Sequence, residues 1–231
     1  MVVTVEKDIQ EILNKWEYQP GVFLVRKIIG DDGKEKIQVR VNLGILQMEI
    51  DGRPDGKTPY NAKSLLDYYL SIIDELVELN GTSDAFVLTE KDMKAIDAEM
   101  MQYYYRRVCL FALKDYALAK RDAEHNLKLM DIIKKHCRDK DYIDSHEKFR
   151  SFVIMERARA AILDCISSND HAGAMKHVNE AIEMIEPIYR EQGFGEEELK
   201  RVTELNMLKK WRSQIHQDWE GGIVEIDEDR P

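Results

Sequence analysis

The chain has 231 residues, of which 44% are hydrophobic and 34% charged, and its formal net charge is -10. This apolar content is enough for a packed core, which excludes disorder of the whole chain. The negative charge argues against nucleic acid or an anionic membrane as partner, because basic residues occur only in short groups flanked by acids.

The cysteines and the first residues predict an intracellular, cytoplasmic location. Cys109, Cys137 and Cys165 are three in number, so they cannot all pair within the chain, and no two form a C-x-x-C unit. This usage is typical of a reducing compartment. Residues 1–16 carry acids where a signal peptide would be basic and apolar, and no apolar run approaches the length of a membrane span. We therefore expect a soluble protein.

The N-terminal part is expected to form a short helix and a small β-hairpin. The helix is predicted to run from Thr4, its N-cap, to Trp16. Two strands follow over residues 22–30 and 35–50, and the Asp32-Gly33 pair between them is typical of a hairpin turn. A two-stranded ribbon is not stable alone, so one of its faces is expected to lie on the helices.

The second predicted strand changes the side on which its apolar residues lie. In the first half the apolar residues have odd numbers, as in Ile37 and Val39, whereas in the second half they have even numbers, as in Met48 and Ile50. One extra residue must be accommodated between the two pairs, and Gly44 is the natural position for a β-bulge. We expect a strand that bends at this glycine and folds over the helices.

A polar segment with the sequence DGRPDGKTP, residues 51–59, follows this strand. It lacks the alternating acids and closing Glu of a calcium loop, and it misses the phosphate-loop spacing by one residue. A proline followed by Asp-Gly is typical of a tight turn, which favours a corner between the strand and the helices. In the alternative interpretation, a functional loop, Arg53 and Lys57 present a small basic contact.

From residue 61 onward the sequence predicts helices only. Ser64 is an expected N-cap, and Thr89-Glu90-Lys91-Asp92 has the form of a capping box. The first of these helices is expected from Asn61 or Ser64 to Asn80, and the second from Thr89 to a break at Lys114-Asp115-Tyr116. A third helix begins after that break, and a fourth covers residues 145–167. A fifth runs from Asp170 to Gln192, and the last one ends at about Trp219.

Two of the predicted helix pairs are similar in sequence. The segments ALKDYALAKRDAEHNLKLM and CISSNDHAGAMKHVNEAIEMI superpose with Ala119 on Ala174 and Leu127 on Ile182. A tight polar turn, a small residue and an apolar-faced helix in this order resemble the tetratricopeptide repeat, over residues 92–191. The resemblance implies an array of antiparallel helical hairpins that binds a protein or peptide on its concave face.

The match to that repeat is incomplete. The two units lie about 55 residues apart, whereas the period of the repeat is about 34. Arg107 stands where the first helix of the repeat has a small residue. An ordinary helical bundle with alanines at its close contacts is therefore the alternative.

The C-terminal helix has a second resemblance. Its segment ELNMLKKWRSQI, residues 204–215, resembles the helical motif shared by the UvrB and UvrC subunits of bacterial excision repair. Arg212 matches the arginine of that motif, whereas Ser213 stands where the motif has an acid. The resemblance implies docking to a protein partner. The segment LQMEIDGRPDG resembles one that occurs with such helices in uncharacterised bacterial proteins.

The sequence predicts no metal site, no cofactor and no catalytic site. The paired E-x-x-H units of di-iron proteins do not occur, and Asp122-x-x-His125 is a single near match. His136 and Cys137 are adjacent and point in different directions on a helix, which suits metal binding poorly. No nucleophile elbow or nucleotide-binding fingerprint is present.

These patterns predict a mainly α fold of antiparallel helical hairpins with a small N-terminal β-hairpin. The expected regions are residues 1–60, the helical array over 61–220 and an acidic tail over 221–231. The expected function is a non-catalytic protein- or peptide-binding scaffold. The candidate partner-binding residues are Tyr103, Tyr104, Arg107, Asn126 and Arg159 in the array and Arg212 near the C-terminus.

The alternative function is an accessory factor in DNA repair or nucleic-acid metabolism that docks through the C-terminal helix. The run QYYYRRV, residues 102–108, could stack bases between tyrosines beside arginines, but the net charge argues against this. Whether the protein forms a homodimer is left open.

Overall fold

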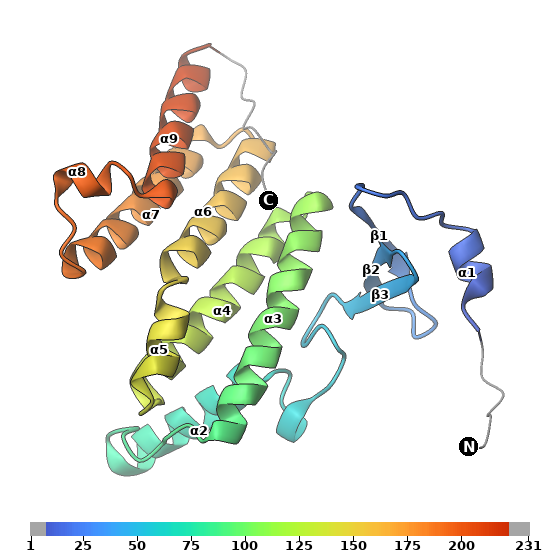
Figure 1. Cartoon of the computed structure of the whole chain (residues 1–231), viewed down its shortest axis with the longest axis horizontal. Helices are drawn as coiled ribbons and strands as arrows, with labels where there is room; N and C mark the ends of the chain where they lie inside the picture. The colour runs from blue at the N-terminus through green and yellow to red at the C-terminus, as the bar shows by residue number, and fades with distance from the viewer. Residues whose placement is uncertain (1–7, 222–231) are drawn as a thin grey trace.

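The structure is a computed structural model that describes residues 8–221 (Figure 1). This part of the chain is mainly helical and carries a three-stranded antiparallel sheet near its N-terminus, which confirms the predicted fold class. The predicted cap Thr4 and the tail after residue 221 lie outside the described residues. The elements are α1 (Gln10–Asn14), β1 (Leu24–Ile29), β2 (Glu35–Val41), β3 (Gly44–Glu49), the 3-10 helix η1 (Pro59–Asn61), α2 (Leu65–Asn80), α3 (Glu90–Ala112), α4 (Tyr116–His136), α5 (Lys140–Glu147), α6 (Arg150–Ser167), α7 (His171–Glu191), α8 (Glu196–Leu199) and α9 (Thr203–Gly221).

The long helices pack in chain order. Helix α3 lies on α4, α4 on α6, α6 on α7 and α7 on α9, while α2 contacts the pair of α3 and α4 (Figure 1). The largest apolar core lies among α4, α6, α7 and α9, and a second core lies where α2 meets α3 and α4. Helix α4 therefore supports α3 on one side and α6 on the other.

The two similar helix pairs have matching turns. Lys114 and Asn169 both have positive φ angles, of 58° and 59°. In each turn the next residue donates its backbone N–H five residues back, from Asp115 to Leu110 O at 2.9 Å and from Asp170 to Cys165 O at 2.8 Å. These turns are built alike, as the superposed sequences suggest. Whether the pairs are tetratricopeptide repeats stays a prediction.

The helix starts agree with the predicted caps. The Ser64 hydroxyl accepts the backbone N–H of Asp67 at 3.1 Å at the start of α2. At the start of α3, the Asp92 carboxylate accepts the backbone N–H of Thr89 at 2.9 Å, and Thr89 Oγ1 accepts the N–H of Asp92 at 3.3 Å. These bonds satisfy N–H groups that a helix start otherwise leaves without partners.

The helix predicted over residues 145–167 is two helices. Helix α5 begins after Asp139, whose carboxylate accepts the N–H of Tyr142 at 3.0 Å, and it ends before Lys148. The break places Arg150, the first residue of α6, against Glu147 at 2.6 Å and Asp131 at 2.8 Å. The cap at Asp139 starts the first helix earlier than the apolar pattern alone predicts.

The long second strand predicted over residues 35–50 is also two strands, and this corrects the prediction of a bulge at Gly44. The chain reverses at Asn42-Leu43, so that β2 and β3 run antiparallel with Val41 opposite Gly44 and Ile37 opposite Met48. This register pairs residues of opposite parity on one face of the sheet. A two-residue turn therefore accounts for the change of parity.

The sheet packs on α3 through one face. Ile37 and Val39 of β2 lie in a buried cluster with Met48 and with Cys109 and Leu110 of α3. Burial raises the pKa of the Cys109 thiol to about 12, so this thiol stays protonated at neutral pH. The same cluster includes Ala119 of α4 and Ala160 of α6, and it holds the sheet beside α3 (Figure 1).

Candidate functional site

Helix α3 exposes a row of large apolar side chains. Met101 is 45% exposed, Tyr104 36%, Tyr105 53% and Val108 38%. Residues spaced by three, four and seven positions share one face of a helix, so these four form a continuous row, the α3 stripe. The opposite face of α3 is buried against α4, which leaves the stripe facing solvent.

Next to the stripe, α3 and α6 bring two arginines and one acid together. We call these residues the Arg107 cluster: Tyr104, Arg107 and Phe111 of α3 with Glu156 and Arg159 of α6. The Arg107 guanidinium carbon lies 5.4 Å from the centre of the Tyr104 ring, and that of Arg159 lies 4.8 Å from the Phe111 ring. Arg159 Nη1 lies 3.8 Å from Glu156 Oε1.

Arg107 is buried without the partners that its charge calls for. Its side chain is among the largest buried ones, with 1% of the residue exposed, and its Nε and Nη1 atoms have no hydrogen-bond partner among residues 8–221. Burial lowers the pKa of Arg107, and the nearby Glu156 carboxylate partly offsets that effect. Burial likewise raises the pKa of Glu156, which Arg159 and Arg107 partly offset.

Asn126 of α4 is a second buried polar residue with an unused atom. It is 4% exposed, and its Nδ2 donates to Met100 O of α3 at 3.1 Å. That bond fixes the orientation of the amide, and its Oδ1 has no hydrogen-bond partner in the described part of the chain. Met100 precedes Arg107 by seven residues on α3.

The structure brings some of the predicted site residues together and separates others. Tyr104, Arg107 and Arg159 meet in the Arg107 cluster, whereas Asn126 of α4 contacts Met100 of α3, seven residues before Arg107. Two members of the cluster, Phe111 and Glu156, are not among the residues predicted from the sequence. Phe111 lies four residues after Arg107 and Glu156 lies three residues before Arg159, so helical spacing could have placed each on the same helix face as its arginine. Tyr103 and Arg212 lie elsewhere.

Tyr103 belongs to the buried side of α3. Its ring stacks on His125 with centroids 3.4 Å apart, and its hydroxyl donates to Gly52 O at 3.1 Å. Burial raises the pKa of Tyr103 to about 12. This residue therefore holds the loop after β3 in place and is not on the exposed face.

Arg212 lies on the solvent side of α9. The apolar residues around it, including Leu208, Trp211 and Ile215, are buried in the main core. The apolar face of this helix is therefore occupied within the chain, and a docking role for Arg212 stays a prediction.

The polar segment after β3 is bound to the helices by its own charges. Arg53 donates to both carboxylate oxygens of Asp55 at 3.0 and 2.9 Å and lies 3.3 Å from the buried Glu99. Glu99 also accepts the N–H groups of Leu65 at 2.8 Å and Leu66 at 3.2 Å. These contacts support the interpretation of a structural corner between strand and helices.

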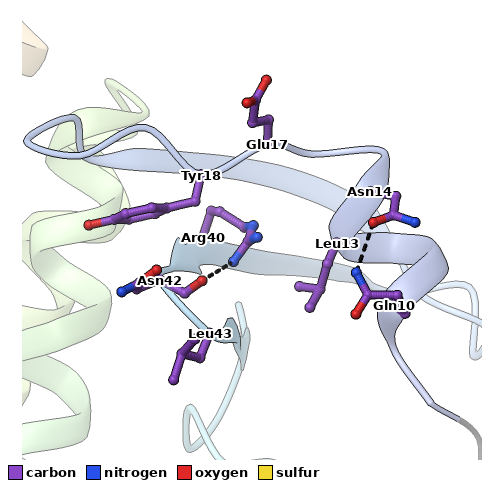
Figure 2. A pocket seen from close by; sticks show the side chains of 8 residues that line it. All are labelled: Gln10, Leu13, Asn14, Glu17, Tyr18, Arg40, Asn42 and Leu43. Carbon is purple, nitrogen blue, oxygen red and sulfur yellow. Dashed lines mark hydrogen bonds between the residues drawn. The ribbon is translucent and has the colours of Figure 1, made fainter.

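An open depression of about 630 Å³ lies between α1 and the turn that joins β2 to β3 (Figure 2). Arg40 lies between Tyr18 and Asn42 there and donates to backbone oxygens, at 2.7 Å to Trp16 and 3.0 Å to Gly44. The volume suits a small ligand. However, the Arg40 guanidinium already donates hydrogen bonds to backbone carbonyl oxygens. Arg40 therefore attaches the segment around Trp16 to the sheet.

Within the described part of the chain, no three His, Cys, Asp or Glu side chains gather closely enough to bind a metal ion. The near match Asp122-x-x-His125 is used internally, because Asp122 binds Arg106 at 2.7 Å and His125 Nε2 lies 3.0 Å from Glu99. No helix between residues 8 and 221 has both the length and the apolar content needed to cross a bilayer.

Comparison with known proteins finds no matching family, no matching curated protein and no matching solved structure.

Proposed function

We propose that the chain is a non-catalytic, cytoplasmic scaffold that binds a protein or peptide on the α3 stripe. The observation that carries this proposal is the row of Met101, Tyr104, Tyr105 and Val108. Single exposed apolar residues are common on protein surfaces, whereas a contiguous group indicates an interaction site. Tyrosine and methionine are also enriched at the centres of protein interfaces.

The surroundings of the stripe support a binding role. The Arg107 cluster borders it on the α6 side, so charged side chains lie next to the apolar row. Interfaces commonly combine an apolar centre with such polar groups at its rim. The three free cysteines agree with a reducing cytoplasm.

Selection from a displayed library of random peptides tests this function. The full chain should enrich peptides that share apolar or aromatic positions, and their binding should depend on the stripe. Tyr105→Lys and Val108→Glu should each weaken that binding at least about tenfold, because they place a charge in the apolar row. Leu79→Lys is the matched control, since Leu79 is an exposed apolar residue of another helix, α2.

Two results would contradict the proposal. One is a selection that enriches no peptide over repeated rounds. The other is a set of binders whose affinity for the two stripe variants equals that for the Leu79→Lys control.

A further inference from the structure

We propose that β3 is a self-pairing edge, at which two copies of this chain join their three-stranded sheets edge to edge. The two copies are related by a two-fold axis beside Leu46, so that Leu46 of one copy lies opposite the partner's Leu46. This inference goes beyond the proposed function, because it concerns another surface and does not depend on the α3 stripe.

The backbone of β3 faces outward at alternate residues. The strand order is β1-β2-β3, so β3 forms one edge of the sheet (Figure 1). Val41 and Gly44 flank a two-residue turn, and in such a hairpin this pair and every second pair after it exchange hydrogen bonds. The even-numbered residues of β3 therefore bond to β2. The N–H and C=O groups of Ile45, Gln47 and Glu49 point away from it.

Two of these three residues have free backbone groups. Glu49 is already bonded, because its N–H donates to Pro54 O at 2.9 Å and its C=O accepts from Arg106 Nη1 at 2.9 Å. The outward N–H and C=O groups of Ile45 and Gln47 form no hydrogen bond with any other residue between 8 and 221. Such groups on a sheet edge are a template for pairing with a further strand.

The side chains leave this edge accessible and ordered. Leu46 faces the same side of the sheet as its pair Val39, which is buried under the helices, yet Leu46 is 54% exposed. Gln47 is also exposed, and its side chain is held from within the sheet, since Gln38 Nε2 donates to Gln47 Oε1 at 2.9 Å. A strand that is ordered in advance loses little conformational freedom when it pairs.

Charge permits a second copy at this edge and opposes one at the other. Each chain has a net charge of -10, and charged side chains on edge strands commonly prevent self-pairing. Residues 43–48 contain no charged side chain. The opposite edge strand, β1, has Arg26 and Lys27 at its middle, where self-pairing would set like charges against each other.

The free groups also fix the register and match a second copy. With the axis at Leu46, Ile45 of each copy pairs with the partner's Gln47, and all the free groups of both residues are used. An axis at Gln47 would need the groups of Glu49, which are occupied, and an axis at Ile45 would need Leu43, which lies in the turn. The contact between the two leucines removes their exposed side chains from water.

The contact is short, so we expect weak and reversible association. Stable protein interfaces bury about 1,200 Å² or more, which is more than one edge strand supplies. The dimer should therefore form at micromolar or higher concentrations and dissociate on dilution.

Sedimentation velocity of the full chain over a concentration series tests the inference. The protein should pass from monomer to dimer as its concentration rises, and it should stop there because a two-fold contact closes on itself. Leu46→Lys should raise the dissociation constant at least about tenfold, because it sets like charges opposite each other. Ile29→Lys is the matched control and should leave the constant unchanged, since Ile29 is 67% exposed on the other edge strand.

A mixture of two variants tests the register. Leu46→Glu alone should weaken the dimer as Leu46→Lys does. An equal mixture of the two variants should recover the association, because opposite charges then face each other across the axis. Damage to the fold could not produce such a recovery.

A cross-link tests the same contact. The two copies of residue 46 form a pair that exchanges no hydrogen bonds, and the Cα atoms of such a pair lie about 4.5 Å apart, within the range of a disulfide. Leu46→Cys with oxidised glutathione as the electron acceptor should give a covalent dimer on a non-reducing gel. Ile29→Cys should give no more dimer than the unmodified chain, whose free cysteines set the background.

Three results would overturn the inference. A chain that stays monomeric at every concentration would leave this edge to a strand of another protein. A dimer with an unchanged dissociation constant in Leu46→Lys would be held together by another surface. A mixture of the Lys and Glu variants that does not recover association would contradict the pairing about Leu46.

Discussion

Arg106 donates from Nε and Nη2 to the two carboxylate oxygens of Asp122, at 2.7 and 2.8 Å, inside the contact between α3 and α4. Both side chains are buried. The remaining nitrogen, Nη1, donates to Glu49 O at 2.9 Å and to Gly52 O at 2.8 Å. One side chain thus ties the two helices to the chain that leaves the sheet.

Removal of Asp122 is expected to destabilise the protein strongly. Asp122→Ala leaves Arg106 buried without its counter-ion, which should lower the free energy of unfolding by about 3–5 kcal/mol in urea titrations. The double variant Arg106→Met with Asp122→Leu should lose less, because it buries no unpaired charge. An equal or larger loss in the double variant would contradict this explanation.

Gly44 is expected to tolerate a side chain. Its φ angle is not positive, and a Cβ built there meets only Val41 Cγ2, at 4.0 Å. Gly44→Ala should therefore change the free energy of unfolding by less than about 0.5 kcal/mol. A bulge glycine with positive φ would lose about 1 kcal/mol or more in the same urea titration, so the variant separates the two structures.

The sheet shows what the sequence alone could indicate. The change of parity between Val39 and Met48 was a real signal, since the two residues lie on one face. A bulge and a two-residue turn both shift the apolar residues from odd to even positions. The two differ only in whether the residues before the shift pair with those after it as neighbouring strands. Asn42-Leu43 lacks the glycine that usually marks such a turn, so the reversal went unrecognised.

Asp92 gives stability that depends on pH. Its carboxylate accepts from Thr89 and from the Tyr69 hydroxyl at 2.9 Å. Burial alone would raise the pKa of Asp92, but these hydrogen bonds outweigh it and lower the pKa below its ordinary value of 3.8. The stabilisation is therefore complete above pH 3.8 and is lost as the pH falls through the lowered pKa.

Asp92→Asn should thus cost about 1 kcal/mol at neutral pH. The difference from the unmodified protein should shrink in urea titrations below pH 3.8, where Asp92 becomes protonated. Asp74→Asn, on the exposed side of α2, should cost little at any pH. A difference that grows on acidification would contradict the sign of the shift.

Arg40 is expected to hold the segment around Trp16 in place. Arg40→Met removes its bonds to Trp16 O and to the turn between β2 and β3 (Figure 2), at a cost of about 2 kcal/mol. Limited digestion with trypsin should then cut faster after Lys15 than in the unmodified protein. Lys34→Met, in the exposed turn between β1 and β2, should leave that rate unchanged.

The candidate site was only partly predictable. Spacing on one helix placed Tyr104 beside Arg107, and Arg159 was a candidate residue of the same helical array. Sequence spacing does not show which polar atoms lack hydrogen-bond partners. The unpaired side-chain atoms of Arg107 and Asn126 are therefore visible only in the structure. The partner of the Tyr103 hydroxyl, Gly52, lies 51 positions away in the sequence, too far for a local pattern to indicate it.

The bonds from Arg106 to the loop after β3 also constrain the order in which the chain folds. Arg106 and Glu49 are 57 positions apart, whereas Arg106 and Asp122 are 16 apart. Short loops close at lower entropic cost, so the pair of α3 and α4 should form before the sheet attaches. Tyr103→Phe, which removes one bond to the loop, should then mainly speed unfolding in stopped-flow experiments and hardly slow folding.

This folding order is the reverse of the order in which the segments are synthesised. Residues of the sheet leave the ribosome first, yet Ile37 and Val39 find their buried neighbours only after α3 has emerged. The nascent sheet therefore remains uncovered while more than sixty further residues are translated, as the separation of Ile37 from Leu110 in the sequence requires.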